Sequence, residues 1–117
     1  MSPNELALEL RRGPDAPATA RAAITRQLNG QLSAQRLFDL RVVVSTLVSN
    51  SIRNGRGPIE VHLSKVRDVV RGEVGDQGPG AASLRELSQK QGRPGLSVLD
   101  AVARDWGTDA RQVWFVV

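Results

Sequence analysis

The chain has 117 residues, enough for one domain with one hydrophobic core, and it contains no cysteine and one histidine. This composition excludes disulfides, thiolate metal sites and histidine clusters. The net charge is +4, but aromatic residues are only 3% and the basic residues are spread evenly, so the charge favours anionic ligands or an acidic protein partner over direct contact with nucleic acid. No apolar run approaches the ~20 residues of a membrane helix, and the first residues lack a signal-peptide pattern, so we expect a cytoplasmic protein without membrane contact.

The N-terminal segments alternate between strand and helix patterns. An alternating apolar run predicts a short strand over 6–10, which Gly13 and the proline after it end. Asp15 is a favourable N-cap residue and predicts a helix over about 16–29, closed by Gly30 and the asparagine before it.

A longer helix follows, capped by Ser33 and extending to about Arg53, with apolar residues at the 3.6-residue period. Thr46, Asn50 and Asn54 are four residues apart and share one face of this helix. A solvated polar face is one interpretation of this pattern. The other is a binding face, because an asparagine oxygen is a good neutral ligand for Mg²⁺ beside phosphates.

Two further alternating runs, 59–66 and 69–75, predict a β-hairpin. His62 falls on the polar side of the first strand, where we expect it to be exposed.

The second strand of this hairpin ends in a glycine-rich stretch over 75–80 that contains Asp76. A carboxylate at the end of a strand can accept a hydrogen bond from an exocyclic amine such as that of adenine. Gly78 and Gly80 leave the backbone open to a ligand. An ordinary turn is the alternative, because aspartate and glycine are both common in turns.

The remaining segments are a glycine-bounded loop over 78–94, an amphipathic helix over Leu96–Asp105 and a final strand over 112–117. A glycine turn over 92–96 opens directly into this helix, which would aim backbone N–H groups at an anion. The sequence contains neither a P-loop nor a Rossmann glycine motif.

Taken in order, these segments resemble the histidine-kinase-like (GHKL) ATPase family, and within it the anti-sigma-factor serine-protein kinases of Gram-positive bacteria and actinobacteria. Residues 44–55 resemble the N-box helix, 74–80 the G1 box, and 92–100 with 103–107 the G2 box and its helix. The resemblance implies one α+β domain over 1–117. Its fold would be the Bergerat-type two-layer sandwich, a mixed, mostly antiparallel sheet covered on one face by about three helices.

The resemblance also implies that ATP or ADP binds with Mg²⁺ between the long helix, the loop and the helix after it. Asp76 would bind the adenine amine, and Asn50 would hold Mg²⁺ against the phosphates. The other implied nucleotide contacts are Gly78, Gly80, Lys90, Gly92, Arg93, Gly95 and Leu96.

Several positions depart from the family pattern. Thr46 stands where the family has a glutamate that acts as general base, and a hydroxyl cannot take a proton at neutral pH as a carboxylate does. Pro94 has no N–H to offer in the G2 turn, Gln112 replaces a threonine near adenine, and Asn54 stands where histidine or lysine is common. We therefore assign no catalytic residue and expect a pseudo-kinase.

The resulting hypothesis is an ATP-binding regulator that resembles an anti-sigma factor and acts in bacterial transcription. It would control a sigma factor or a STAS-type anti-anti-sigma protein with weak or absent kinase activity, and a homodimer is compatible with this role. One alternative is an active serine-protein kinase that phosphorylates an anti-anti-sigma factor with a substitute base. The other is a nucleotide-free protein-interaction module.

Overall fold

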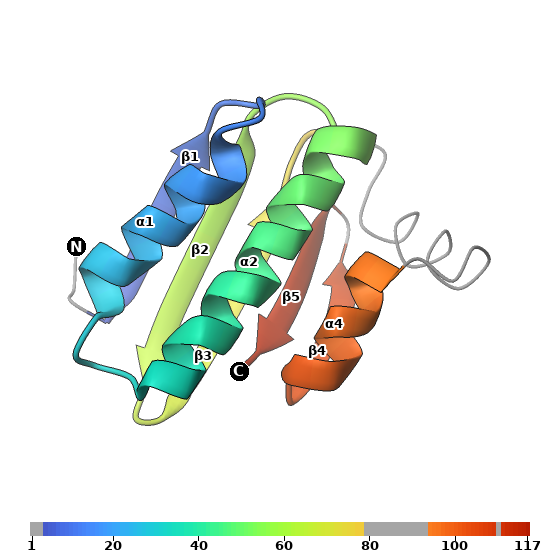
Figure 1. Ribbon diagram of the computed structural model, residues 1–117. Helices are drawn as coiled ribbons and strands as arrows, with labels where there is room; N and C mark the ends of the chain where they lie inside the picture. The colour runs from blue at the N-terminus through green and yellow to red at the C-terminus, as the bar shows by residue number, and fades with distance from the viewer. Residues whose placement is uncertain (1–3, 79–93, 110) are drawn as a thin grey trace.

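The computed structural model describes residues 4–78, 94–109 and 111–117 (Figure 1). Within them, alternation of buried and exposed residues builds a five-stranded sheet in the order β1-β2-β3-β5-β4, in which every neighbouring pair is antiparallel. The strands are β1 (Glu5–Leu10), β2 (Ile59–Val66), β3 (Val69–Gly75), β4 (Asp105–Asp109) and β5 (Gln112–Val116).

Three helices of the described residues cover one face of this sheet: α1 (Ala16–Leu28), α2 (Ala34–Asn54) and α4 (Pro94–Val102) (Figure 1). α2 runs along the middle of the sheet and packs against α1 on one side and α4 on the other. The apolar stripe of α2 meets the inward side chains of the sheet, because both must leave water. The largest fully buried side chains of this core are Phe115, Ile24, Leu28, Leu40, Leu47, Ile59 and Leu99.

The predicted α+β class and the single helical layer are confirmed, but the expected mixed sheet is antiparallel throughout its described part. The hairpin of β2 and β3, the final strand and the first three elements lie close to their predicted bounds. Ser33 caps α2 as expected, because its hydroxyl oxygen accepts a hydrogen bond from the backbone N–H of Arg36 at 3.2 Å. No helix in the described part of the chain has the length and apolar content needed to cross a membrane.

The predicted N-cap position of Asp15 is confirmed, but its side chain does not cap α1. Asp15 occupies the N-cap position, but its backbone is already helical (φ −85°, ψ −12°) and its side chain makes no capping hydrogen bond. An N-cap side chain reaches the first turn from an extended backbone, and here a backbone bond from Ala16 N to Gly13 O, 3.1 Å long, forms the entry to the helix instead.

The predicted helix over Leu96–Asp105 extends too far, because α4 ends at Val102 and the residues from Asp105 form β4. The chain leaves the helix at Arg104, whose backbone N–H donates to the carbonyl oxygen of Val116 at 2.8 Å. Trp106 then pairs with Phe115 of β5 instead of continuing the apolar stripe of the helix. Pairing with a distant strand outweighs the local helical pattern at this point.

The predicted loop over 78–94 falls almost entirely on residues 79–93, which lie outside the described residues.

Gly72 provides a test of the packing between sheet and helices. A Cβ atom at Gly72 would overlap the ring of Phe115 on β5 and lie 2.7 Å from Cδ2 of Leu63 on β2. We expect Gly72→Ala to lower the free energy of unfolding by about 1–3 kcal/mol through overpacking. Urea denaturation measures the change. Gly13→Ala is the matched control, because a Cβ atom there meets nothing within 4 Å, and equal stability of the two variants would contradict this account.

Candidate functional site

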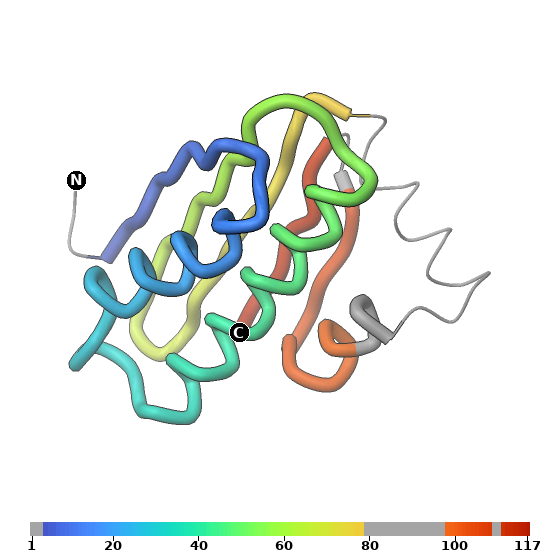
Figure 2. Tube along the Cα trace, turned by 45° about the horizontal axis from the view of Figure 1, so that its top comes forward, coloured from blue at the N-terminus to red at the C-terminus, as the bar shows by residue number. Residues whose placement is uncertain are grey.

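Asp76 lies directly after β3, where the end of this strand approaches the turn that follows α2 (Figure 2). Two hydrogen bonds and one ion pair hold its carboxylate. The hydroxyl of Ser51, on the last turns of α2, donates to Oδ2, and the backbone N–H of Gly78 donates to Oδ1 at 2.6 Å. The guanidinium of Arg12, two residues beyond β1, lies 3.7 Å from Oδ2. With only 13% of its side chain exposed, Asp76 depends on these donors to keep its charge inside the protein.

Arg12 joins three segments at this end of the sheet. Besides pairing with Asp76, its guanidinium donates to the carbonyl oxygen of Ser51 in α2 and, through Nε, to that of Gly57 at 3.1 Å. The planar guanidinium has five N–H donors in a fixed geometry, which suits one side chain to several acceptors at once. The ends of β1 and α2 and the turn after α2 are therefore fixed relative to the carboxylate.

Two glycines allow this close approach. A Cβ atom on Gly55 would overlap the carboxylate of Asp76, and one on Gly78 would lie 2.9 Å from Cα of Gly55 and 2.9 Å from Oδ1 of Asp76. Gly78 was predicted as a residue that leaves the backbone open to a ligand. In the structure it brings its own N–H group to the carboxylate.

A carboxylate has about four acceptor positions. Two of those on Asp76 accept hydrogen bonds from Ser51 and Gly78, and Arg12 forms an ion pair at Oδ2. One position, on Oδ1, is left for a further donor. This count makes Asp76 chemically able to accept one hydrogen bond from an amine while it stays bound within the protein.

Asn50 is 3% exposed, and this burial excludes the interpretation that it belongs to a solvated face. It shares a stripe of α2 with Val43 and Arg36, at a spacing of seven residues. Arg36 donates to the carbonyl oxygen of Val117, just beyond β5, so this stripe lies on the side of α2 that faces β5 and α4. Half-buried Thr46 lies one turn before Asn50, as the spacing predicts.

The side-chain amide of Asn50 has one engaged end and one unpaired end. Its Oδ1 accepts a hydrogen bond from the guanidinium of Arg53, whereas Nδ2 is buried with no hydrogen-bond partner. Exchanging the two atoms would turn Nδ2 toward the guanidinium and set donor against donor, so the bond from Arg53 fixes the orientation of the amide.

This arrangement does not fit the Mg²⁺ ion that the resemblance implies. The one ligating atom of Asn50 is occupied by a cationic donor, and a nitrogen such as Nδ2 is a poor ligand for a hard cation. The described residues also contain no cluster of three or more acidic, histidine or cysteine side chains that could hold a metal.

The other predicted contacts have a limited description. Gly80, Lys90, Gly92 and Arg93 lie outside the described residues, and their expected roles stay predictions. Gly95 and Leu96 belong to the first turn of α4, where the backbone alone is described.

Sequence reasoning missed Ser51 and Arg12. The signal for Ser51 was present, since a serine directly follows Asn50 in a polar cluster of α2. No comparable signal marks Arg12, because it reaches Asp76 across 64 residues of chain through the fold.

Two of the surface hollows along the described sheet contain residues singled out in the sequence. One, of about 250 Å³, is lined by Asp76 together with Pro58, Glu60, Gly75, Gln77, Arg111 and Gln112. Glu60 and Gln112 alternate with the buried residues of their strands, so this hollow opens toward the face of the sheet opposite the helices.

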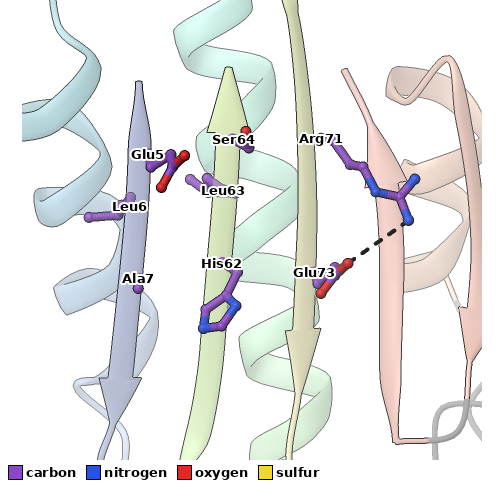
Figure 3. Close-up of a pocket in the computed structure, with 8 residues that line it drawn as sticks. All are labelled: Glu5, Leu6, Ala7, His62, Leu63, Ser64, Arg71 and Glu73. Atoms are coloured by element: carbon purple, nitrogen blue, oxygen red, sulfur yellow. Dashed lines mark ion pairs between the residues drawn. The ribbon is translucent and has the colours of Figure 1, made fainter. Parts of the chain in front are cut away.

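The other hollow, of about 360 Å³, lies along β1, β2 and β3 and includes His62 (Figure 3). His62 is exposed, as predicted, and its neighbour Glu73 forms an ion pair with Arg71 at 3.9 Å. Arg71 also lies 5.2 Å from the centre of the Trp114 ring. The charges of Arg71 and Glu73 are thus partly balanced within the hollow, which Glu5 also lines.

Comparison with known proteins leaves the family open: no protein-family model matches this sequence, and no curated protein matches it.

The contribution of Arg12 can be measured through stability. Arg12→Met keeps most of the side-chain length but removes every donor, which leaves the carboxylate of Asp76 without its cationic partner. We expect the free energy of unfolding to fall by about 1–3 kcal/mol, measured by urea denaturation. Arg11→Met is the matched control, because Arg11 is exposed and its side chain makes no hydrogen bond or ion pair with the described residues. A loss of similar size in both variants would contradict the role of Arg12.

Proposed function

We propose that the protein is an ATP- or ADP-binding regulator with the Bergerat-type fold of the GHKL ATPases, related to anti-sigma factors. The observation that carries this proposal is Asp76: a nearly buried carboxylate at the end of β3, positioned by Ser51 and the N–H of Gly78, with one acceptor position left. The order of elements supports it. The polar helix α2 precedes the hairpin that ends in Asp76, and α4 follows and packs beside α2.

Adenine is the base that suits this acceptor. Its exocyclic amine donates a hydrogen bond, which the remaining position of Oδ1 can accept, whereas guanine carries a carbonyl oxygen at the equivalent place and would set acceptor against acceptor. A site built around a hydrogen-bonding group strongly rejects an analogue that leaves the group unpaired.

Regulation fits the residues better than catalysis does. Thr46 occupies the position at which the resembling kinases have their general base, and its hydroxyl cannot serve as one near pH 7. We therefore propose that the protein acts by binding a sigma factor or a STAS-type protein in bacterial transcription control, with the nucleotide as a structural ligand.

A second candidate function is a nucleotide-free interaction module. It is favoured by Arg12 and Arg53, which satisfy Asp76 and the oxygen of Asn50 within the protein itself. A nucleotide-binding measurement separates the two candidates.

The base preference follows from Asp76. By isothermal titration calorimetry we expect ATP to bind, and Asp76→Asn to weaken its affinity roughly 5- to 150-fold, because the amide leaves a donor unpaired. Asp68→Asn, a change on the exposed turn between β2 and β3, is the control. GTP should bind the parent protein more weakly than ATP, which tests the same hydrogen bond without a variant if Asp76→Asn does not fold. Equal affinity for ATP and GTP would contradict the assignment of Asp76.

The expected lack of catalysis can be tested on the parent protein. Loss of a general base typically lowers a rate by about 10²–10⁴-fold. We expect transfer of radiolabelled phosphate from ATP to a STAS-type protein to stay at background, while an active serine kinase of this branch labels its own acceptor in the same assay. Robust labelling of the STAS-type protein by the parent protein would contradict the proposed regulator and favour the active serine-protein kinase.

A further inference from the structure

Arg53 donates a hydrogen bond to the atom of Asn50 that a metal ion would need as its ligand. Its guanidinium donates to Oδ1, the one atom of the Asn50 side chain that could ligate a hard cation. Asn50 is 3% exposed and its Nδ2 is buried without a partner, so the amide has no second oxygen to offer and cannot turn without losing the bond to Arg53. A cation approaching the second lone pair of Oδ1 would come close to the positive charge of Arg53 and be repelled by it.

The surroundings add no negative charge that would attract a metal ion. Thr46, one turn earlier on α2, is neutral. The nearby end of the helix carries Arg53, and Arg56 lies two residues beyond it. Asp76 is already paired with Arg12. The described part of the site therefore has the charge of an anion site and lacks the carboxylates typical of a magnesium site.

We propose that nucleotide phosphates bind here without a divalent metal, with the guanidinium of Arg53 as their counter-charge. This inference rests on the proposed nucleotide-binding function and names the ligand form that the site takes: free ATP or ADP in place of the magnesium complex. Arginine suits this role because its planar guanidinium forms paired, charge-assisted hydrogen bonds with phosphate oxygens. Arg53 is exposed, so its side chain is accessible to a ligand while it stays hydrogen-bonded to Asn50.

Metal dependence of binding is the direct test. The full chain is titrated with ATP by calorimetry, once in excess EDTA and once in excess MgCl₂. We expect binding in EDTA to be at least as tight as in MgCl₂, because magnesium masks the phosphate charges that Arg53 contacts. Binding that requires MgCl₂ would overturn this inference and leave the proposed function standing. An absence of ATP binding in both buffers would overturn the proposed function and this inference with it.

Two variants assign the effect to Arg53. Arg53→Gln should weaken ATP binding in EDTA by roughly tenfold or more, the loss expected for charge-assisted hydrogen bonds. Adenosine, which lacks phosphates, should bind this variant and the parent protein equally. Because the substitution also frees Oδ1 of Asn50, MgCl₂ should now tighten ATP binding.

Arg56→Gln is the matched control, since Arg56 is an exposed arginine just beyond the same helix whose side chain has no hydrogen bond or ion pair with described residues. Equal losses of ATP affinity in Arg53→Gln and Arg56→Gln would indicate a general charge effect and overturn the assignment to Arg53. Unchanged ATP affinity in Arg53→Gln would overturn it as well. Circular dichroism melting without ligand shows whether each variant keeps its fold.

Discussion

One carboxylate fixes the geometry of this end of the molecule. Asp76 is largely removed from water, so its charge must be balanced by donors inside the protein. These donors come from segments far apart in the sequence: Arg12 after β1, Ser51 in α2, and the backbone of Gly78. Gly55 and Gly78 permit the close packing because neither carries a Cβ atom that would strike the carboxylate or the neighbouring backbone. The relative positions of β1, α2 and β3 at the candidate site follow from satisfying this one charge.

Two arginines give the site its chemical character. Arg12 contacts the proposed base-binding carboxylate, and Arg53 contacts the amide oxygen that would otherwise suit a metal ion. The carboxylate of Asp76 and the amide oxygen of Asn50 thus have partners within the protein, whereas Nδ2 of Asn50 has none. The remaining acceptor position on Asp76 and the positive charge at Arg53 are complementary to the two ends of an adenine nucleotide, an amine at the base and anionic oxygens at the phosphates. Because Arg12 and Arg53 contact these groups within the protein, a nucleotide-free interaction module is the main alternative to the proposed regulator.

The edge of the sheet beyond β3 shows how non-local contacts change a local pattern. Trp106 continues the apolar spacing of α4, yet it lies in β4 opposite Phe115. Its indole N–H donates a hydrogen bond to the carboxylate of Asp100 in α4 at 2.7 Å. The side chain of Trp106 therefore links β4 to α4, the helix in which the apolar spacing of the sequence had placed it. The backbone bond from Arg104 to Val116 begins the strand two residues after α4 ends. The helical layer is thereby tied to the outer strands.

The sequence by itself determined the order of the elements other than β4, the α+β class, the buried face of α2 and the position of Asp76 at a strand end. Each of these follows from the spacing of apolar residues and from turn residues within a few positions. It also placed Thr46 and Asn50 one turn apart on one face. Only the tertiary structure decided that the described sheet is antiparallel throughout, that residues 105–109 form a strand, and that Arg12 and Arg53 engage Asp76 and Asn50. Strand pairing, and the ion pair of Arg12 with Asp76, join residues far apart in the chain. The hydrogen bond from Arg53 to Asn50 is local, but many acidic and amide groups could accept from an arginine. Which of them does so depends on which side chains the fold removes from water.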